Sequence, residues 1–343
     1  MPSMPSRSAG VLKAVAAGLT LAFGSSAAHA VDIKFTLDWK FEGPAAPFLV
    51  ADDKGYFKAE GLNVTIDTGS GSREPITRIA SGTYQMGFGD INALVKFIDE
   101  QPDAKVKAVM VMYERPPFAI IGRKSLGVTD VKSLAGKTLG APPTDGAFGQ
   151  WAVLQKVACI VTSSIKIENV GFPVREPMLA QGKVAAIFGF SFSSVLNLKS
   201  QGVPADDISL ILMAENGLDL YGNSVMVGTD FAAKNPDAVK GFLKALMKGV
   251  QDTIKDPDTA VDSVLKRNTV VTKPVELERL KMAIAQNFVT PAVKKDGFGG
   301  VDAGKLAKSL DLLKVSLDLK NQPKADAVFD GSFLPPADAR KIN

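Results

Sequence analysis

The stretch from residue 33 to residue 92 constrains the fold most, because it repeats the order strand, loop and helix three times. Each repeat opens with a short apolar or alternating run that predicts a β-strand, at 33–37, 62–66 and 85–89. A stretch with helical spacing follows each loop, so we expect neighbouring strands to pair in parallel. The sequence therefore predicts an α/β fold, in which the loops at the carboxyl ends of the strands converge on a ligand crevice.

A second set of strands and helices later in the chain follows the same plan. With 343 residues, of which 46% are hydrophobic, the chain can bury two cores. We expect lobe I to combine residues 31–118 with residues 223–343 and lobe II to contain residues 119–222, with a ligand cleft between them.

The first thirty residues have the three parts of a secretory signal peptide. Arg7 and Lys13 give a positive start, residues 14–23 are largely apolar, and small residues precede Ala30. The apolar run is shorter than the roughly 20 residues that a membrane-spanning helix needs. We expect cleavage after Ala30 and export to the periplasm.

The composition excludes several classes of function. Without Arg7 and Lys13, basic residues outnumber acidic residues by only two, and no long basic run occurs, so nucleic acid is not an expected partner. The only histidine, His29, leaves with the signal peptide, which excludes histidine-based catalysis and zinc sites. The only cysteine, Cys159, lies in an apolar helical pattern over residues 153–159 and is expected to be a buried structural thiol.

Five strings of residues carry a resemblance to a known family. They are DKGYFKAEGL at 53–62, the step at 80–87 with Ser-Gly and Met-Gly, LAGKTLG at 134–140, MLAQGKVAA at 178–186 and FAAKNPDAV at 231–239. In this order they resemble periplasmic substrate-binding proteins in the nitrate, sulfonate, taurine and thiamine-precursor group of ABC importers. The strings cover most of the chain after residue 30. Gln85 and Ala185 depart from the pattern, since aspartate often stands at both positions.

The resemblance implies a type II periplasmic-binding-protein fold that closes over a small-molecule solute and delivers it to ABC permease subunits, as a monomer without a cofactor. The acidic first loop favours a neutral or aminated heterocycle such as a thiamine-precursor pyrimidine. A sulfonate, nitrate and an aromatic acid remain alternatives, as does a sensor role beside a membrane kinase. The same fold family includes the eukaryotic pyrimidine synthase of thiamine biosynthesis, but that enzyme needs a histidine and a cysteine-rich string. We therefore expect no enzymatic turnover.

The candidate ligand-binding residues follow the predicted strands on both walls of the crevice. They are Asp38, Trp39, Glu42, Gly71, Ser72, Asp90, Asn92, Asp145, Phe172, Phe190 and Ser191. We expect the ring of Trp39 to stack on a planar ligand, with Asp38, Asp90 and Asn92 fixing its orientation.

Each of these residues also has a purely structural interpretation. Trp39 could pack the rim of the lobe, and Asn92 stands where a helix N-cap belongs. Each carboxylate could cap a helix or pair with Lys40 or Arg73. Gly71 and Ser72 could serve as a turn before a helix, whereas Trp151 lies inside a predicted helix and is expected in the core.

Overall fold

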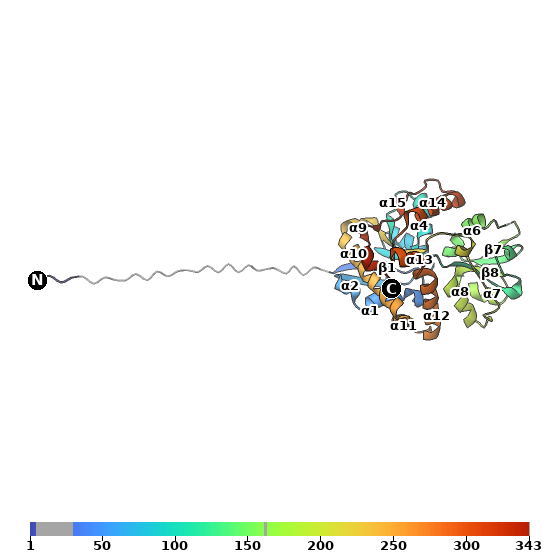
Figure 1. Cartoon of the computed structure of the whole chain (residues 1–343), viewed down its shortest axis with the longest axis horizontal. Helices are drawn as coiled ribbons and strands as arrows, with labels where there is room; N and C mark the ends of the chain where they lie inside the picture. The colour runs from blue at the N-terminus through green and yellow to red at the C-terminus, as the bar shows by residue number, and fades with distance from the viewer. Residues whose placement is uncertain (5–29, 161–162, 343) are drawn as a thin grey trace.

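The computed structural model describes residues 1–4, 30–160 and 163–342 and contains two five-stranded sheets, which lie in separate halves of the molecule (Figure 1). Sheet A has the order β2 (Leu62–Asp67), β1 (Val31–Thr36), β3 (Met86–Asp90), β10 (Asn223–Gly228) and β4 (Val106–Val111). Sheet B has the order β7 (Lys166–Asn169), β6 (Thr138–Ala141), β8 (Ala186–Phe190), β5 (Phe118–Arg123) and β9 (Ile208–Leu212).

Both sheets are mixed and not purely parallel. The pairs of β1 with β2 and β3, and of β6 with β7 and β8, are parallel as predicted. By contrast, β10 runs antiparallel to β3 and β4, and β5 runs antiparallel to β8 and β9. An apolar run indicates a buried strand but carries no information on its direction, and for this reason the sequence could not predict the antiparallel pairs.

Helices pack around both sheets. Those of the sheet-A half are α1 (Ala46–Asp53), α2 (Tyr56–Ala59), α3 (Glu74–Ala80), α4 (Ile91–Glu100), α9 (Thr229–Lys234), α10 (Pro236–Lys255), α11 (Pro257–Leu265), α12 (Lys273–Ala283), α13 (Pro291–Asp296), α14 (Ala303–Leu317) and α15 (Ala325–Val328). Those of the sheet-B half are α5 (Gly146–Gly149), α6 (Trp151–Val157), α7 (Phe172–Ala180) and α8 (Ser191–Ser200). The short 3-10 turns are η1 (Gly43–Ala45), η2 (Lys124–Leu126), η3 (Lys132–Leu134), η4 (Met213–Asn216), η6 (Gly331–Phe333) and η7 (Ala337–Arg340), and a π-helical turn, η5 (Ile284–Phe288), follows α12.

The core of the sheet-A half forms where β1 meets α1 and α10. Along β1 the buried residues Ile33 and Phe35 alternate with exposed polar residues, the pattern of a strand with one face on a core. The ring of Phe35 stacks on Phe242 of α10 with centroids 5.1 Å apart and lies 5.1 Å from Phe48 of α1. Between residues 239 and 250 the apolar residues of α10 recur at helical spacing, the pattern expected of a face packed in a core, and they are buried.

The chain crosses between the sheets twice, after β4 and again after β9. The first crossing spans residues 112–117 and the second spans residues 213–222. Tyr113 lies in the first crossing and contacts rings from both halves, Phe88 at 5.3 Å and Phe192 at 6.1 Å between centroids. These crossings fall next to the predicted lobe boundaries at 118/119 and 222/223, which remain a prediction as limits of moving units.

Some elements differ from the sequence prediction. The expected helix over residues 148–158 is interrupted at Gln150, between α5 and α6, and Trp151 packs in the core against Phe188 as expected, with centroids 5.3 Å apart. The prediction that Cys159 is buried is wrong, because α6 ends at Val157 and Cys159 follows it as an exposed residue with a φ of 50°. The apolar pattern continues beyond Val157, so it could not predict that the helix ends there.

The predicted signal peptide lies almost entirely outside the described residues, which begin with residues 1–4 and resume at residue 30. Within the described ranges, no helix combines the length and apolar character that crossing a membrane requires.

Candidate ligand-binding site

A cavity lies between the two halves, at the carboxyl ends of the parallel strands. The cavity and its open mouth together enclose about 580 Å³ of space not filled by atoms, part of which is open solvent. Of the predicted residues, those that line it are Asp38, Trp39, Glu42, Gly71, Ser72, Asp145, Phe172 and Phe190. The further lining residues are Leu37, Lys40, Pro44, Ala45, Phe88, Tyr113, Gly146, Arg175, Phe192 and Ser193.

Aromatic rings from both halves meet in this cavity. Trp39, just after β1, contacts Phe172 at the start of α7 edge to face, with centroids 4.7 Å apart and planes at 61°. Phe190, at the end of β8, lies 6.5 Å from Tyr113. At 4.7 Å no further ring fits between Trp39 and Phe172, so a planar ligand either lies beside this pair or takes the place of one ring.

Three carboxyl groups, those of Asp38, Glu42 and Asp145, line the cavity. Asp38 accepts a hydrogen bond of 2.8 Å from Asn223 Nδ2, and burial raises the pKa of its carboxyl from 3.8 to about 7. Burial likewise raises the pKa of Glu42 and of Asp145. The positive charge of a nearby arginine, Arg279 for Glu42 and Arg175 for Asp145, lowers the pKa by a smaller amount. Near neutral pH the carboxyl of Asp38 can therefore donate as well as accept a hydrogen bond.

Arg175 also lines the cavity, and acidic residues of the sheet-B half balance its positive charge. Its side chain is buried, with Nη1 at 3.0 Å from Asp145 and Nη2 at 2.6 Å from Glu176. Ser194 Oγ donates to the same Glu176 oxygen at 2.9 Å. The guanidinium also lies over the ring of Phe172, 5.3 Å from its centroid. This arrangement fixes Phe172 and leaves no uncompensated positive charge on Arg175 for an anionic ligand.

Asp90 and Asn92, which we expected to orient the ligand, are not among the lining residues. Asp90 is the N-cap of α4: its Oδ1 accepts from the backbone N–H and the side chain of Asn92, at 3.0 and 2.7 Å. Its Oδ2 accepts from Gln150 Nε2 at 3.1 Å, and burial raises its pKa to about 6. Asn92 also donates to the carbonyl of Tyr221 at 2.7 Å. The strand order predicted where this loop lies, but the side chains of Asp90 and Asn92 bond at the start of α4 and do not line the cavity.

Ser191 also lies away from the lining. It is the first residue of α8, and its Oγ donates to Gln286 Oε1 in the π-helical turn at 2.9 Å. Ser191 thus contributes to a contact between the two halves, and its predicted ligand contact remains a prediction.

Gly71 and Ser72 form the turn before α3 and touch the opposite wall. Gly71 has a φ of +112°, and a Cβ there would lie 2.7 Å from the carbonyl oxygen of Thr144 in the sheet-B half. Ser72 is buried, and its Oγ has no hydrogen-bond partner among the described residues. Glycine is therefore required for the close approach of the two walls, and Ser72 offers a hydroxyl to a ligand.

The sequence prediction missed several lining residues. Tyr113 follows the predicted strand at 106–112, so its position at a strand end was a usable signal. Arg175 begins a predicted helix over residues 175–182, and Phe192 lies in a predicted loop over residues 189–193. In both cases the side chains that face the cavity depend on packing that sequence spacing does not specify. Among the described residues, no group of three or more histidine, cysteine, aspartate or glutamate side chains could hold a metal ion.

Comparison with known proteins places this architecture in a family. A family model described as NMT1/THI5 like matches residues 44–260, more than half of the chain. The chain belongs to the NMT1/THI5 like family. The matched range contains Asp145, Phe172 and Arg175, whereas the loop with Asp38, Trp39 and Glu42 lies before it.

Two relatives have names that point to heterocyclic compounds. The chain is 28% identical over 226 residues to the riboflavin-binding protein RibY of Chloroflexus aurantiacus, covering 64% of this chain and 62% of that protein. It is 25% identical over 265 residues to a 4-amino-5-hydroxymethyl-2-methylpyrimidine phosphate synthase of Aspergillus parasiticus, covering 74% of this chain and 75% of that enzyme.

A solved structure supports the predicted fold. The periplasmic aliphatic sulphonate binding protein SsuA of Escherichia coli is 12% identical and superposes with a TM-score of 0.66, covering 86% of this chain and 94% of that one. The NMT1/THI5 like chain therefore has the periplasmic-binding-protein fold, as the sequence strings predicted.

Proposed function

We propose that this protein is a periplasmic solute receptor of an ABC importer, which binds a neutral or weakly basic planar heterocycle with N–H donors and passes it to the membrane permease. The observation that carries the proposal is the charge of the aromatic cavity. Asp38, Glu42 and Asp145 line it, and its buried cation Arg175 is already paired with two carboxylates. Such a lining repels a bare anion and accepts hydrogen bonds from ring or amino N–H groups.

The same charge distribution argues against the alternatives of a sulfonate, nitrate or an aromatic acid. Burying an anion beside three carboxyl groups would require an uncompensated cation. The other lining cation, Lys40, is exposed and lies over the Trp39 ring, 5.4 Å from its centroid. The names of RibY and of the pyrimidine phosphate synthase relatives are consistent with a flavin or a pyrimidine as the ligand.

A thermal-shift and calorimetry panel of the purified protein tests this proposal. Riboflavin, 4-amino-5-hydroxymethyl-2-methylpyrimidine, an alkanesulfonate and nitrate are compared at equal concentration and pH. A ligand at about 100 times its Kd should stabilise the folded protein by about 2.7 kcal/mol, which is easily measured. Stabilisation by a heterocycle and not by the anions supports the proposal. The reverse order would contradict it.

Pyrimidine phosphate synthesis is the second candidate, since several relatives at 25–27% identity carry that name. After residue 30 the sequence contains no histidine, and its single cysteine, Cys159, is exposed and is not a lining residue. We propose that the protein returns its ligand unchanged. Mass spectrometry of the pyrimidine after prolonged incubation checks this, and recovery of a chemically altered product would favour the enzyme.

A further inference from the structure

We propose that Arg279 is the positioning residue of this site: it holds Glu42, and through Glu42 the ring of Trp39, and it does so fully only when the two halves are together. Arg279 lies in α12, is 3% exposed and is not among the residues that line the cavity. It also lies outside the range matched by the family model. For its binding readout the proposal rests on the function proposed above.

On the sheet-A side, Arg279 is held by two acids. Its Nε lies 3.1 Å from Glu276 Oε2, one helical turn earlier, and its Nη1 lies 3.4 Å from Glu42 Oε2. Glu276 is fully buried and also accepts the backbone N–H of Gly43 at 2.6 Å. Helix α12 therefore contacts this loop twice. Glu276 holds the backbone of Gly43, and Arg279 holds the side chain of Glu42.

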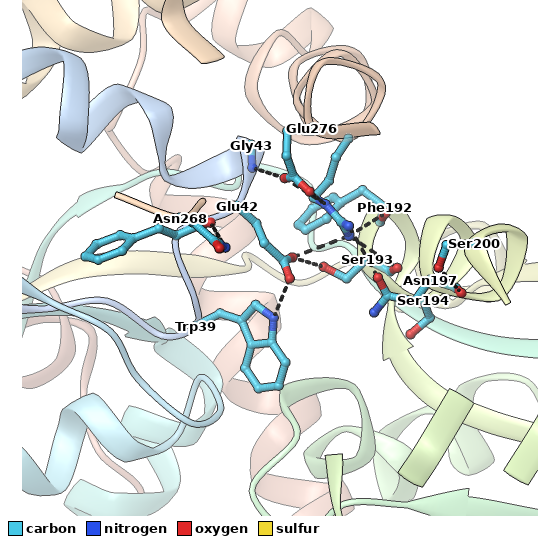
Figure 2. A network of polar contacts seen from close by, with 12 residues as sticks. Trp39, Glu42, Gly43, Phe192, Ser193, Ser194, Asn197, Ser200, Asn268 and Glu276 are labelled. Atoms are coloured by element: carbon cyan, nitrogen blue, oxygen red, sulfur yellow. Dashed lines mark hydrogen bonds and ion pairs between the residues drawn. The ribbon is translucent and has the colours of Figure 1, made fainter. Parts of the chain in front are cut away.

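Glu42 links Arg279 to the indole ring of Trp39 (Figure 2). Its Oε1 accepts from Trp39 Nε1 at 3.3 Å, and its Oε2 accepts from Ser193 Oγ at 3.3 Å. Without Arg279, the buried carboxyl of Glu42 would lose its cation and become protonated or turn toward water. In either case the acceptor that fixes the indole of Trp39 is weakened.

On the sheet-B side, Arg279 contacts the first half of α8. Its Nη1 donates to the carbonyl oxygens of Phe192 and Ser193 at 3.3 Å each, and its Nη2 donates to Asn197 Oδ1 at 3.3 Å. The planar guanidinium reaches these three acceptors and both acids at once, which the ammonium of lysine cannot do. Separation of the halves breaks all three contacts to α8, so Arg279 favours the closed arrangement in which Trp39 faces Phe172.

The test measures Trp39 directly. In a Trp151→Phe background Trp39 is the only tryptophan, so acrylamide quenching reports its exposure. Compared with that background, Arg279→Lys should increase quenching, increase the radius of gyration in small-angle scattering, and weaken riboflavin binding on the order of tenfold through a faster dissociation rate.

A matched control comes from the same pair of helices. Lys199 of α8 and Glu278 of α12 form an ion pair of 2.8 Å, but their side chains are 39% and 51% exposed. Lys199→Ala removes a link between the halves without touching Glu42, and it should leave the quenching of Trp39 unchanged. An effect of Lys199→Ala equal to that of Arg279→Lys would show that any bridge matters and would overturn the positioning role.

The remaining outcomes also decide the question. Unchanged quenching and scattering in Arg279→Lys would overturn the proposal. If Arg279→Lys does not fold, Asn197→Ala, which removes one acceptor of the guanidinium, should shift both readouts in the same direction by a smaller amount, and no shift would overturn the proposal. If the protein itself binds neither riboflavin nor the pyrimidine, the proposed ligand class fails, while quenching and scattering still decide the role of Arg279.

Discussion

Two buried arginines, Arg175 and Arg279, differ in where their partners lie. Arg175 and Arg279 are each 3% exposed and each pairs with two carboxylates. All side-chain partners of Arg175 belong to the sheet-B half, whereas Arg279 joins acids of the sheet-A half to acceptors on α8. Each arginine has one acid that lines the cavity, Asp145 or Glu42, and one buried acid that does not, Glu176 or Glu276. The difference is that Arg279 also donates to α8 in the other half. The cluster of Arg175 therefore stabilises one half, whereas that of Arg279 also favours closure.

The largest expected effect is the loss of stability in Arg175→Ala. Removing one partner of a buried ion pair costs about 3–5 kcal/mol, because an unpaired charge stays buried. Arg279→Ala should also lose stability, because Glu276 stays buried, and it alone should separate the halves, because its contacts to α8 are lost. Urea denaturation measures both losses, and small-angle scattering compares the two variants. An expansion of Arg175→Ala equal to that of Arg279→Ala would break the comparison.

Trp39→Ala should affect binding and not folding. Loss of an aromatic contact costs about 0.5–1.5 kcal/mol beyond the buried area, so affinity for the heterocycle should fall on the order of tenfold to a hundredfold. The melting temperature of the protein without added ligand should stay nearly unchanged, because Trp39 lies at the cavity wall. The matched control is Trp151→Phe in the core of the sheet-B half, which should lower the melting temperature and spare affinity. A large drop in melting temperature for Trp39→Ala with affinity spared would instead make Trp39 a packing residue.

Asp38→Asn should change how stability depends on pH. The pKa of Asp38 is raised from 3.8 to about 7 by burial, so the folded protein keeps a proton that the unfolded chain loses between these values. The free energy of unfolding therefore falls as the pH rises from about 4 to about 7, by at most about 1.4 kcal/mol per pH unit for one group. Asp38→Asn should flatten this slope.

The flattening should be partial, because Asp90, with a pKa of about 6, acts in the same direction. Denaturation at a series of pH values for the protein, Asp38→Asn and Asp38→Asn with Asp90→Asn measures both slopes. A slope that Asp38→Asn leaves unaltered would show that this carboxyl is hydrated in solution.

The smallest effect is expected for Lys199→Ala. Exposed ion pairs contribute about 0–1 kcal/mol and are screened by salt. This variant should change both stability and riboflavin affinity by less than about fivefold in the equilibrium constants. A larger effect that disappears at high salt would show that the surface bridge, and not Arg279 alone, favours closure.

Strand ends were predictable, and side-chain directions were not. Trp39 and Glu42, which line the cavity, were predicted there because they follow an apolar strand, and parallel pairing brings such ends to one edge. The same rule selected Asp90 and Asn92, whose side chains satisfy the backbone and the connection at the start of α4 instead. The order of strands locates a loop, while local capping decides which way its polar groups point.

The proposed role of Arg279 could not be predicted from the sequence. Glu42 and Arg279 are far apart in the chain, and the predicted helix that contains Arg279 shows its inward face only after packing against α8. Likewise, the exposure of Cys159 depends on where α6 ends, which the apolar pattern did not reveal. Contacts between distant segments depend on tertiary packing, and a single sequence does not show which residues form them.

The position of β10 between β3 and β4 sets an order for folding. Sheet B is complete within residues 118–212, whereas β4 lacks a strand partner in sheet A until β10, at Asn223–Gly228, has arrived from beyond the whole of sheet B. Such distant pairing is slow, because the intervening chain must be closed into a loop first. We therefore expect a folding chain to pass through a species in which sheet B is complete and the edges of β3 and β4 that β10 will cover are still exposed. Substitutions that slow the pairing of β10 should lengthen the lifetime of that species and raise the yield of aggregates, even where the finished protein is as stable as before.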